Sequence, residues 1–301
     1  MSRKIVIHGI IPALVTPFTS EGGVDEEAFR EIVRFQIRSR VNGFFVNGTT
    51  GMGPVMPSAQ RKRTAEIVVE ETKGSIPIII QIGAVDPWVS LDLATHAEKI
   101  GADAVACLTP FFYQPGDDAI IEHYQHLSEK TSLPIFVYNI PRNTGNNVSA
   151  SLLLKLSNIP RVVGIKDSSG DFSQLLDYLQ ILPEDFNVLN GADNYQFSAF
   201  CAGVKAGVSA TANVIPELFT EMYEAYKTRD VDKGKRLQIK IHSTRALLNK
   251  PPLAPLLEAL RMRGLKSGCV KAPLRSMTSI EIANLRESLT RLLPEIKLAN
   301  N

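Results

Sequence analysis

The sequence predicts a (β/α)8 barrel on the strength of three observations. Eight short apolar runs rich in β-branched residues recur along the chain at intervals of roughly 25–35 residues. The runs are apolar throughout instead of alternating, which is typical of parallel strands covered on both faces. A stretch with helical periodicity follows each run, and eight strand–helix units make up such a barrel. The predicted strands are 10–16, 43–47, 76–82, 104–108, 135–139, 162–166, 187–190 and 207–210.

The helices between these strands have recognisable ends. Asp25, Ser58 and Asp86 stand directly before helical stretches, where a short polar side chain can accept a hydrogen bond from a free backbone amide. A proline follows Asp86, as is common at the first helical position. Gly74 and Gly101 end two of the helices before the next strand, as C-terminal glycines often do.

An open, doubly wound sheet is the alternative architecture. A dinucleotide-binding sheet of that kind carries G-x-G-x-x-G after its first strand, and no such motif follows residue 16. The eighth predicted helix covers 216–229, and the rest of the chain reads as helical at 232–248, 252–262 and 279–293. We therefore expect a catalytic barrel over 1–229 and a C-terminal helical extension over 230–301. Because no low-complexity linker separates the two, the extension is expected to pack on the barrel.

Composition excludes several classes of protein. With 301 residues, 44% hydrophobic and 21% charged, the chain is neither disordered, collagen-like nor a coiled coil. Its net charge of +2 argues against a general nucleic-acid or anionic-membrane surface. The one dense basic run, 61–63, falls in a helical pattern and is interpreted as a solvated face. No apolar run reaches the length of about 18 residues that a membrane span needs.

The cysteines indicate the compartment. Cys107, Cys201 and Cys269 cannot form a closed set of disulfides, and each lies in an apolar or glycine-rich context typical of buried free thiols. The sequence thus predicts a protein of the reducing cytoplasm.

The apolar stretch 5–18 resembles a signal peptide, but two prolines interrupt it and no clear cleavage site ends it, so we expect a first buried strand there.

The ends of the predicted strands indicate where chemistry would occur. Catalytic groups of (β/α)8 barrels project from the C-terminal ends of the strands and from the loops that follow. In this chain these positions are mostly small, hydroxylated or ionisable. They are 16–17, 47–51, 83, 109–110, 138–139, 166–168, 191–193 and 211–213.

Lys166 and Tyr138 are the strongest candidates for catalysis. A lysine at the end of a buried strand has a lowered pKa, and its free amine can attack a ketone to form a Schiff base. Tyr138 ends the preceding strand, so if the registers match, its phenol lies beside the amine and can shuttle protons. The alternatives are a lysine that merely reaches solvent at the barrel mouth and an ordinary half-buried tyrosine.

A turn rich in glycine and threonine follows the second strand. In Gly48-Thr49-Thr50-Gly51, two glycines permit a tight turn, and the amides and hydroxyls can hold a small carboxylate. The turn lacks the Gly-Lys-Ser/Thr of a phosphate-binding Walker loop. Together with a Schiff-base lysine, it predicts a clamp for a keto acid.

Other catalytic classes find little support. His123 and His126 share a helix face and are interpreted as a surface pair, and no cysteine or histidine cluster has zinc spacing. No G-x-S-x-G motif of a serine hydrolase occurs. We expect no metal and no organic cofactor, only a covalent Schiff base with the substrate.

These motifs resemble the dihydrodipicolinate synthase / N-acetylneuraminate lyase family of pyruvate-dependent class I aldolases. The resemblance runs from about residue 9 to 213 and rests on four segments in the same order. It implies a barrel in which Lys166 is the Schiff-base lysine and Tyr138 the proton shuttle. It further implies that Thr49 and Thr50 orient the tyrosine and bind the pyruvate carboxylate, and that the protein is a homotetramer. The four segments are 15–18, 48–51, 138–145 and 164–167.

The chain departs from the synthases of this family at several positions. At Asn143 the synthases carry an arginine that binds the carboxylate of aspartate semialdehyde; only Arg142 next to it offers a replacement charge. Met52 stands where they have glutamate. Phe112 replaces a tyrosine that relays protons across a subunit interface, and Tyr113 offers a substitute only through a different geometry.

Other details resemble archaeal 2-keto-3-deoxygluconate aldolases, which share most of the stretch 45–54. Ser168 supplies a hydroxyl where those aldolases use threonine to contact substrate hydroxyls. Asp193, with Gly191, is placed to hydrogen-bond a polyol, and buried polar groups of this kind select substrates that satisfy them. The predicted substrate-binding residues are Gly48, Thr50, Asn143, Ser168, Gly191, Asp193 and Val208.

The sequence therefore predicts a lyase that forms or cleaves 2-keto-3-deoxy sugar acids through an imine on Lys166, with Tyr138 and Thr49 as the other catalytic residues. Its expected partners are a small keto acid and an aldehyde, with no nucleic acid and no membrane. The alternative is a synthase that condenses pyruvate with aspartate semialdehyde. A third possibility, from another class, is a keto-acid-binding protein without catalytic activity, because a fold alone does not fix function.

Overall fold

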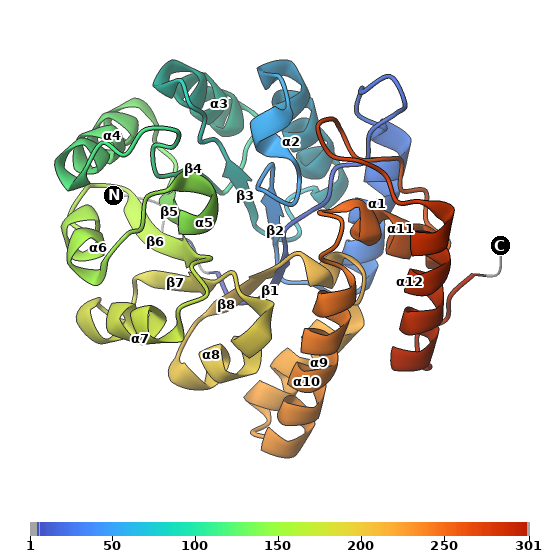
Figure 1. Ribbon diagram of the computed structural model, residues 1–301. Coiled ribbons are helices and arrows are strands. Elements are labelled where there is room, and N and C mark those ends of the chain that lie inside the picture. The colour runs from blue at the N-terminus through green and yellow to red at the C-terminus, as the bar shows by residue number, and fades with distance from the viewer. Residues whose placement is uncertain (1–4, 6, 300–301) are drawn as a thin grey trace.

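Eight parallel strands form one sheet in the order β1-β8-β7-β6-β5-β4-β3-β2 in the computed structural model, which describes residue 5 and residues 7–299 (Figure 1). Each strand follows its predecessor around the ring, as expected for eight consecutive strand–helix units. The strands are β1 (Gly9–Pro12), β2 (Phe44–Val46), β3 (Ile78–Gln81), β4 (Ala104–Leu108), β5 (Ile135–Asn139), β6 (Val162–Asp167), β7 (Asn187–Asn190) and β8 (Ala206–Ser209).

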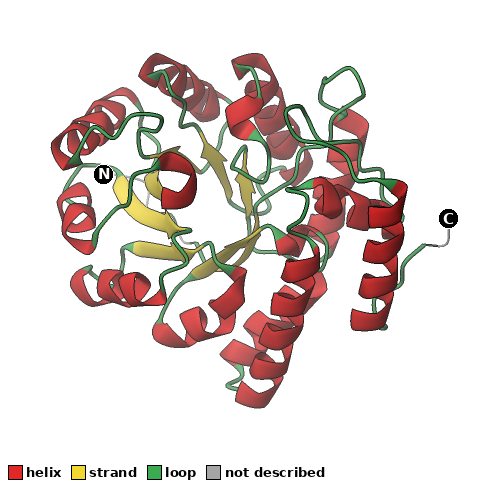
Figure 2. Ribbon diagram, in the orientation of Figure 1, coloured by secondary structure: helices red, strands yellow, loops and turns green. Residues whose placement is uncertain are grey.

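The sheet closes into a barrel between β1 and β2. Ala13 and Phe45 form a parallel bridge just beyond the end of β1. The Leu14 amide donates to the Phe45 carbonyl at 3.0 Å, and the Asn42 amide donates to the Ile10 carbonyl at 2.7 Å. Helices surround the closed ring in Figure 2. The predicted (β/α)8 fold is therefore confirmed.

The boundaries of β1, β2, β3, β6 and β8 differ from the prediction, and those of β1 and β3 have identifiable reasons. β1 ends at Pro12 because the next backbone groups bond to a side chain: Asn213 donates to the Ala13 carbonyl at 2.7 Å and accepts from the Val15 amide at 3.1 Å. β3 begins only after Pro77, which has no amide hydrogen to give to a ladder. β6 continues through Asp167, one residue further than predicted.

Inside and outside positions alternate along the strands and define two apolar layers. Phe45, Phe136 and Tyr138 belong to the cluster that fills the barrel, whereas Phe44 and Val137 pack between strands and helices. The interior is thus a packed core, and only the strand ends offer a site.

The outer helices largely follow the prediction. Asp25 and Asp86 cap their helices by accepting from backbone amides at 3.1 and 2.9 Å. Ser58 is the first residue of its helix instead of the cap, since Pro57 occupies that position. The helices of the barrel are α1 (Glu26–Arg38), α2 (Ser58–Thr72), α3 (Pro87–Lys99), α4 (Asp117–Lys130), α5 (Pro141–Thr144), α6 (Ala150–Leu156), α7 (Phe172–Ile181), α8 (Gln196–Ala202) and α9 (Pro216–Lys227), with 3-10 turns η1 (Gly53–Val55), η2 (Asp193–Tyr195) and η3 (Thr211–Asn213).

The C-terminal helices α10 (Val231–Leu247), α11 (Ala254–Met262) and α12 (Ser279–Leu292) lie against one side of the barrel (Figure 1). Their buried residues share one apolar cluster with β1, α8 and α9. Arg263 forms an ion pair with Glu217 of α9 at 2.7 Å. These contacts bind the tail to the barrel on both its apolar and its charged surfaces.

Two interpretations of the sequence were wrong. Arg61 is buried, not solvated, because the basic run spans more than one face of α2: only Lys62 and Arg63 reach the surface ion pairs. Cys107 is buried, but Cys201 on α8 is exposed and Cys269 is half-buried, since a glycine-rich context does not decide which side of a helix faces the core.

Among the described residues, no helix is both long and apolar enough to span a membrane.

Candidate active site

Lys166 and Tyr138 lie side by side at the C-terminal ends of β6 and β5. Their Cα atoms are direct partners in the parallel register, as the sequence argument required. The Lys166 Nζ atom lies 4.0 Å from the centre of the Tyr138 ring and 4.0 Å from the centre of the Phe45 ring. All three side chains are buried. The amine therefore sits in an aromatic cage with its reactive nitrogen inside the barrel mouth.

Burial lowers the pKa of Lys166 below its usual value of 10.5, because an ammonium loses its hydration in this cage. Tyr138 and the negative charge of Asp193 oppose that effect, whereas the positive charge of Arg142 adds to it. The net direction is downward. A lower pKa enlarges the fraction of free amine, which is the form that attacks a carbonyl.

Thr49 connects the second strand to this pair. Its Oγ1 atom lies 3.1 Å from the Tyr138 hydroxyl, so the two groups share a hydrogen bond. Gly48 is the first residue of the same turn, and a Cβ atom on it would come within 2.8 Å of the Phe45 ring. Thr50 is buried beside it. The glycine–threonine turn thus borders the cage, in agreement with its predicted place.

The turn has its shape because Asn47 anchors it. Asn47 adopts a left-handed φ of +60°, which is uncommon for a residue with a side chain. Its side-chain Nδ2 atom donates to the Arg61 backbone carbonyl at 2.7 Å, and its side-chain oxygen accepts from the Thr64 hydroxyl at 2.7 Å. Gly53 passes so close that a Cβ atom would lie 1.9 Å from the Asn47 carbonyl oxygen. Helix α2 therefore holds the turn that carries Thr49.

A second group of polar residues lies at the ends of β6 and β7. Gly191 donates its amide to the Asp167 carbonyl at 2.6 Å, and a Cβ atom on it would lie 2.1 Å from the Ser168 hydroxyl oxygen. Asp193 is buried nearby, and its Oδ1 atom has no hydrogen-bond partner among the described residues. Burial raises the pKa of Asp193, against the hydroxyls of Thr211 and Ser209, which lower it. These groups form a polar wall near Lys166.

The positions where this chain departs from the synthases occupy the rim. Asn143 in α5 is exposed and accepts a hydrogen bond from the Arg142 Nε atom at 3.2 Å. Phe112, 80% exposed with a φ of +80°, packs edge-on against the exposed ring of Tyr113. Neither ring makes a contact with Lys166. Within one chain, no aromatic hydroxyl from this loop stands in for the expected relay tyrosine, as far as the described residues go.

Val208 belongs to the barrel interior, where it packs in the same cluster as Tyr138. It can shape the floor of the site but offers no polar contact.

Two features of the site escaped the sequence argument. Phe45 is one of the two rings of the aromatic cage. The only signal for it in the sequence is the alternation of inward and outward side chains along β2: Phe44 faces the helices, so Phe45 faces the barrel interior. Asp167 lies on the outer side of β6, where its carboxylate accepts from Asn139 at 2.8 Å and from Ser169 at 2.6 Å. This buried network ties the ends of β5 and β6 together and so fixes the relative positions of Tyr138 and Lys166.

Comparison with known proteins identifies the class of protein. A family model described as the dihydrodipicolinate synthetase family matches residues 6–292, nearly the whole chain. The chain belongs to this family. It is accordingly a class I lyase of the kind that forms a Schiff base with pyruvate.

Individual relatives cover the same span. The 4-hydroxy-tetrahydrodipicolinate synthase of Methanopyrus kandleri is 34% identical over 96% of this chain and 98% of its own length. An uncharacterized DapA-like lyase of Halobacterium salinarum is 34% identical over 95% of this chain and 94% of its own. The crystal structure of the chloride-inhibited dihydrodipicolinate synthase of Acinetobacter baumannii, complexed with pyruvate, superimposes with a TM-score of 0.89 at 28% identity, covering 95% of this chain and 99% of that one.

Proposed function

We propose that this protein joins pyruvate to an aldehyde through a Schiff base on Lys166. The observation that carries the proposal is the Lys166 amine held 4.0 Å from the Tyr138 ring, with Thr49 hydrogen-bonded to the phenol. A buried amine with a lowered pKa is a nucleophile, and a phenol beside it both donates and accepts protons. The pyruvate bound in the related synthase of Acinetobacter baumannii supports the choice of keto acid.

The chemistry follows from these groups. The Lys166 amine adds to C2 of pyruvate, water leaves, and the protonated imine withdraws electrons from C3. Loss of a C3 proton gives an enamine, whose C3 attacks the aldehyde carbon, and a proton then goes to the new alkoxide. Tyr138 is proposed to carry these protons, with Thr49 orienting its hydroxyl. Hydrolysis of the imine releases the product and restores the amine, so the cycle needs neither metal nor organic cofactor.

Pyruvate would lie between the amine and the glycine–threonine turn. Its carboxylate would meet the backbone amides and hydroxyls around Gly48, Thr49 and Thr50, which stand at the edge of the cage. The position of Thr49, one hydrogen bond from Tyr138, would place the carboxylate and the proton carrier on the same side of the imine.

As the aldehyde we propose aspartate semialdehyde, which reverses the preference drawn from sequence. The named function of the Methanopyrus kandleri relative favours the synthase reaction over sugar-acid cleavage. The preference for sugar acids rested on the stretch 45–54, on Ser168 and on Asp193, together with Asn143 in place of the arginine expected of a synthase. Arg142 supports the revised choice, because it is an exposed cation at the rim, hydrogen-bonded to Asn143, and a cation there can attract the carboxylate of the semialdehyde.

Cleavage of a 2-keto-3-deoxy sugar acid is the second candidate, and one observation favours it. The buried Asp193 keeps a carboxylate oxygen without a partner, and the hydroxyl of Ser168 lies on the same wall against Gly191. Such groups would satisfy the hydroxyls of a polyol, whereas aspartate semialdehyde has none to offer.

The Schiff base is tested by borohydride reduction in the presence of pyruvate, followed by peptide mass mapping. We expect an adduct on Lys166 alone, and none in Lys166→Arg, which keeps the charge but lacks a usable amine. Lys155→Arg, on the outer surface of the barrel, is the matched control and should label fully. A modified lysine elsewhere, or a fully active Lys166→Arg, would refute the mechanism.

The aldehyde is tested by assaying aspartate semialdehyde and glyceraldehyde side by side. We expect higher kcat/KM with the semialdehyde, and a selective loss of that activity in Arg142→Ala. Asp193→Asn should reduce glyceraldehyde turnover more than semialdehyde turnover. If turnover is higher with glyceraldehyde and Arg142→Ala does not change it, the result contradicts this choice and supports cleavage of 2-keto-3-deoxy sugar acids.

We also propose a homotetramer in the cytoplasm. Trp88, Phe112 and Tyr113 expose large aromatic surfaces at the mouth side of the barrel, and such surfaces commonly lie in subunit interfaces. The three free cysteines are in keeping with a reducing compartment. Light scattering measures the mass, and a monomer that retains full activity would overturn the assembly proposal.

A further inference from the structure

The C-terminal helix α10 reaches the turn that carries Asp193. The side chain of Gln238 makes this contact with both of its polar ends. Its Nε2 atom donates to the Asp193 carbonyl at 2.8 Å, and its Oε1 atom accepts from the Phe197 amide at 2.8 Å. Asp193 is the first residue of η2, and Phe197 lies in the first turn of α8. One side chain of the extension therefore fixes the backbone at the start of η2 and just after its end.

Helix α10 approaches the turn closely because residue 234 is a glycine. Gly234 is buried one helical turn before Gln238, and a Cβ atom on it would lie 2.1 Å from two carbon atoms of the Phe197 ring. Glycine inside a helix is destabilising relative to alanine, and the close approach accounts for it here. Leu237 and Ile241 of α10 are buried in one apolar cluster with Phe197. The helix is thus packed firmly against the turn.

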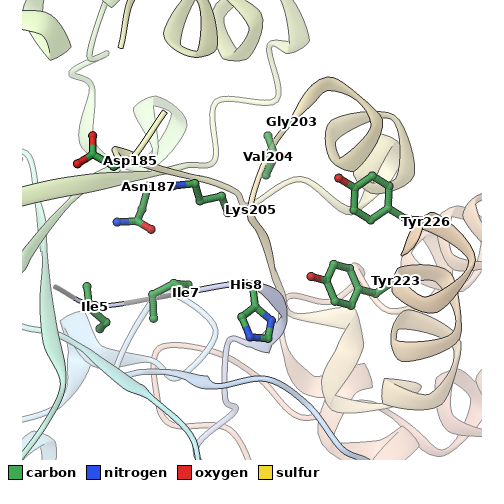
Figure 3. A pocket seen from close by; sticks show the side chains of 10 residues that line it. All are labelled: Ile5, Ile7, His8, Asp185, Asn187, Gly203, Val204, Lys205, Tyr223 and Tyr226. Atoms are coloured by element: carbon green, nitrogen blue, oxygen red, sulfur yellow. The ribbon is translucent and has the colours of Figure 1, made fainter. Parts of the chain in front are cut away.

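Helix α9 holds α8 independently. Phe200 of α8 packs against Tyr223 and Tyr226 with ring centres 5.1 and 5.4 Å away. Figure 3 shows both tyrosines projecting from α9 beside a cavity of about 330 Å³ at the N-terminal ends of the strands, where the Lys205 side chain extends toward Asn187. Catalysis takes place at the opposite end of this fold. Because α9 secures α8 in this way, the fold of α8 does not depend on Gln238 alone.

The turn held by Gln238 borders the site of the Schiff base. β7 pairs with β6 in a register that places Leu189 beside Lys166, and η2 follows directly after the end of β7. The Asp193 side chain is buried there, and its Oδ1 atom has no hydrogen-bond partner among the described residues. A buried carboxylate oxygen without a donor is a group that a substrate can satisfy.

We propose that Gln238 is a positioning residue for the aldehyde: it fixes Asp193 so that the unpartnered carboxylate oxygen accepts a hydrogen bond from that substrate. The inference rests on the proposed aldol reaction, and it makes α10 a support of the active-site wall. A small displacement of Asp193 lowers the rate, because the aldehyde must be aligned with the enamine. Pyruvate is proposed to meet the turn at Thr49, which follows β2, so its binding does not depend on Gln238.

The experiment compares Gln238→Met and Gln238→Glu with the unaltered protein, using whichever of the two aldehydes is turned over faster. Methionine removes both hydrogen bonds, whereas an ionised glutamate keeps the acceptor for Phe197 and loses the donor to Asp193. We expect kcat/KM for the aldehyde to fall about tenfold in both variants, with the KM for pyruvate and borohydride trapping of pyruvate unchanged. Arg236→Met, at an exposed position of α10, is the control and should match the unaltered protein.

A double variant separates positioning from a general structural effect. If Gln238 acts through Asp193, adding Gln238→Met to Asp193→Asn should lower kcat/KM by less than about twofold further, because the carboxylate is already absent. A full tenfold loss in that background, an unchanged kcat/KM in either Gln238 variant, or weakened pyruvate trapping would each refute the role of Gln238. An unaltered protein that forms no adduct with pyruvate would instead refute the proposed function itself.

Discussion

Replacing Arg61 by methionine removes a buried cation that faces no carboxylate. The guanidinium donates from Nη1 to the Gly83 carbonyl at 3.2 Å, and from Nη2 to the carbonyl and the side-chain oxygen of Gln81 at 2.8 and 2.6 Å. Methionine retains much of the stem but none of these donors. The perturbation therefore isolates the guanidinium group.

Two opposing effects set the magnitude. Hydrogen bonds that involve a charged group contribute about 1.5–3 kcal/mol each, and three are lost. Burial lowers the pKa of Arg61 from 12.5 to about 10, which corresponds to about 3 kcal/mol of unfavourable desolvation that methionine avoids. The hydrogen bonds prevail, since their loss also leaves three buried acceptors, two backbone carbonyls and the Gln81 side-chain oxygen, without the donor they now have. We expect the free energy of unfolding to fall by about 2–6 kcal/mol, the loss from the three hydrogen bonds less the desolvation that methionine avoids.

The assay is urea unfolding at pH 7, with Arg63→Met as the control. Arg63 lies two residues away on the same helix, and its ion pairs with Glu26 and Glu70 are partly open to solvent, so its loss should cost less than about 1 kcal/mol. Arg61→Met should also lower kcat, because the guanidinium bonds hold α2 against the end of β3, and the backbone carbonyl of residue 61 that anchors Asn47 and its turn is part of that helix. If Arg61→Met proves no more destabilising than Arg63→Met, the desolvation cost dominates and the reasoning fails.

Four further results are expected. Tyr138→Phe should lower kcat by about 10²–10⁴ in a steady-state assay while pyruvate still forms the imine, and a smaller loss would mean another group carries the proton. The rate of borohydride trapping should rise with pH through a midpoint below 10.5, because burial lowers the pKa of Lys166 and only the free amine reacts; a midpoint at or above 10.5 contradicts this. Gly191→Ala should impair turnover, because the added methyl would stand 2.1 Å from the Ser168 hydroxyl oxygen, and unaltered kinetics would show that this wall moves freely. Truncation after Arg229 should yield insoluble protein, because the tail shares an apolar cluster with the barrel; a folded, active fragment by circular dichroism and assay would show that the tail is dispensable.

The periodicity of the chain determined the fold. Strands buried on both faces are apolar throughout and strands of a parallel barrel recur with their helices, so the eight units are readable without coordinates. The strand ends then directed attention to Lys166 and Tyr138, because parallel strands bring their C-terminal ends to one edge. Their direct pairing followed from this register.

The tertiary structure decided what depends on orientation. The run 61–63 looks uniformly basic, but the direction in which α2 faces the barrel buries Arg61 and leaves Arg63 in solvent. In the same way, the sequence placed Phe112 and Tyr113 in one loop, and only the structure shows that both rings are exposed and pack against each other.

The sequence by itself therefore determined the barrel and the placement of Lys166 beside Tyr138, since these rest on local periodicity and on strand ends that must converge. It left open the aromatic cage of Phe45, the unpartnered oxygen of Asp193 and the cavity beside Lys205. Each of these is made by side chains from separate strands and helices. Their distances are set by how the helices pack around the barrel, which no short stretch of sequence encodes.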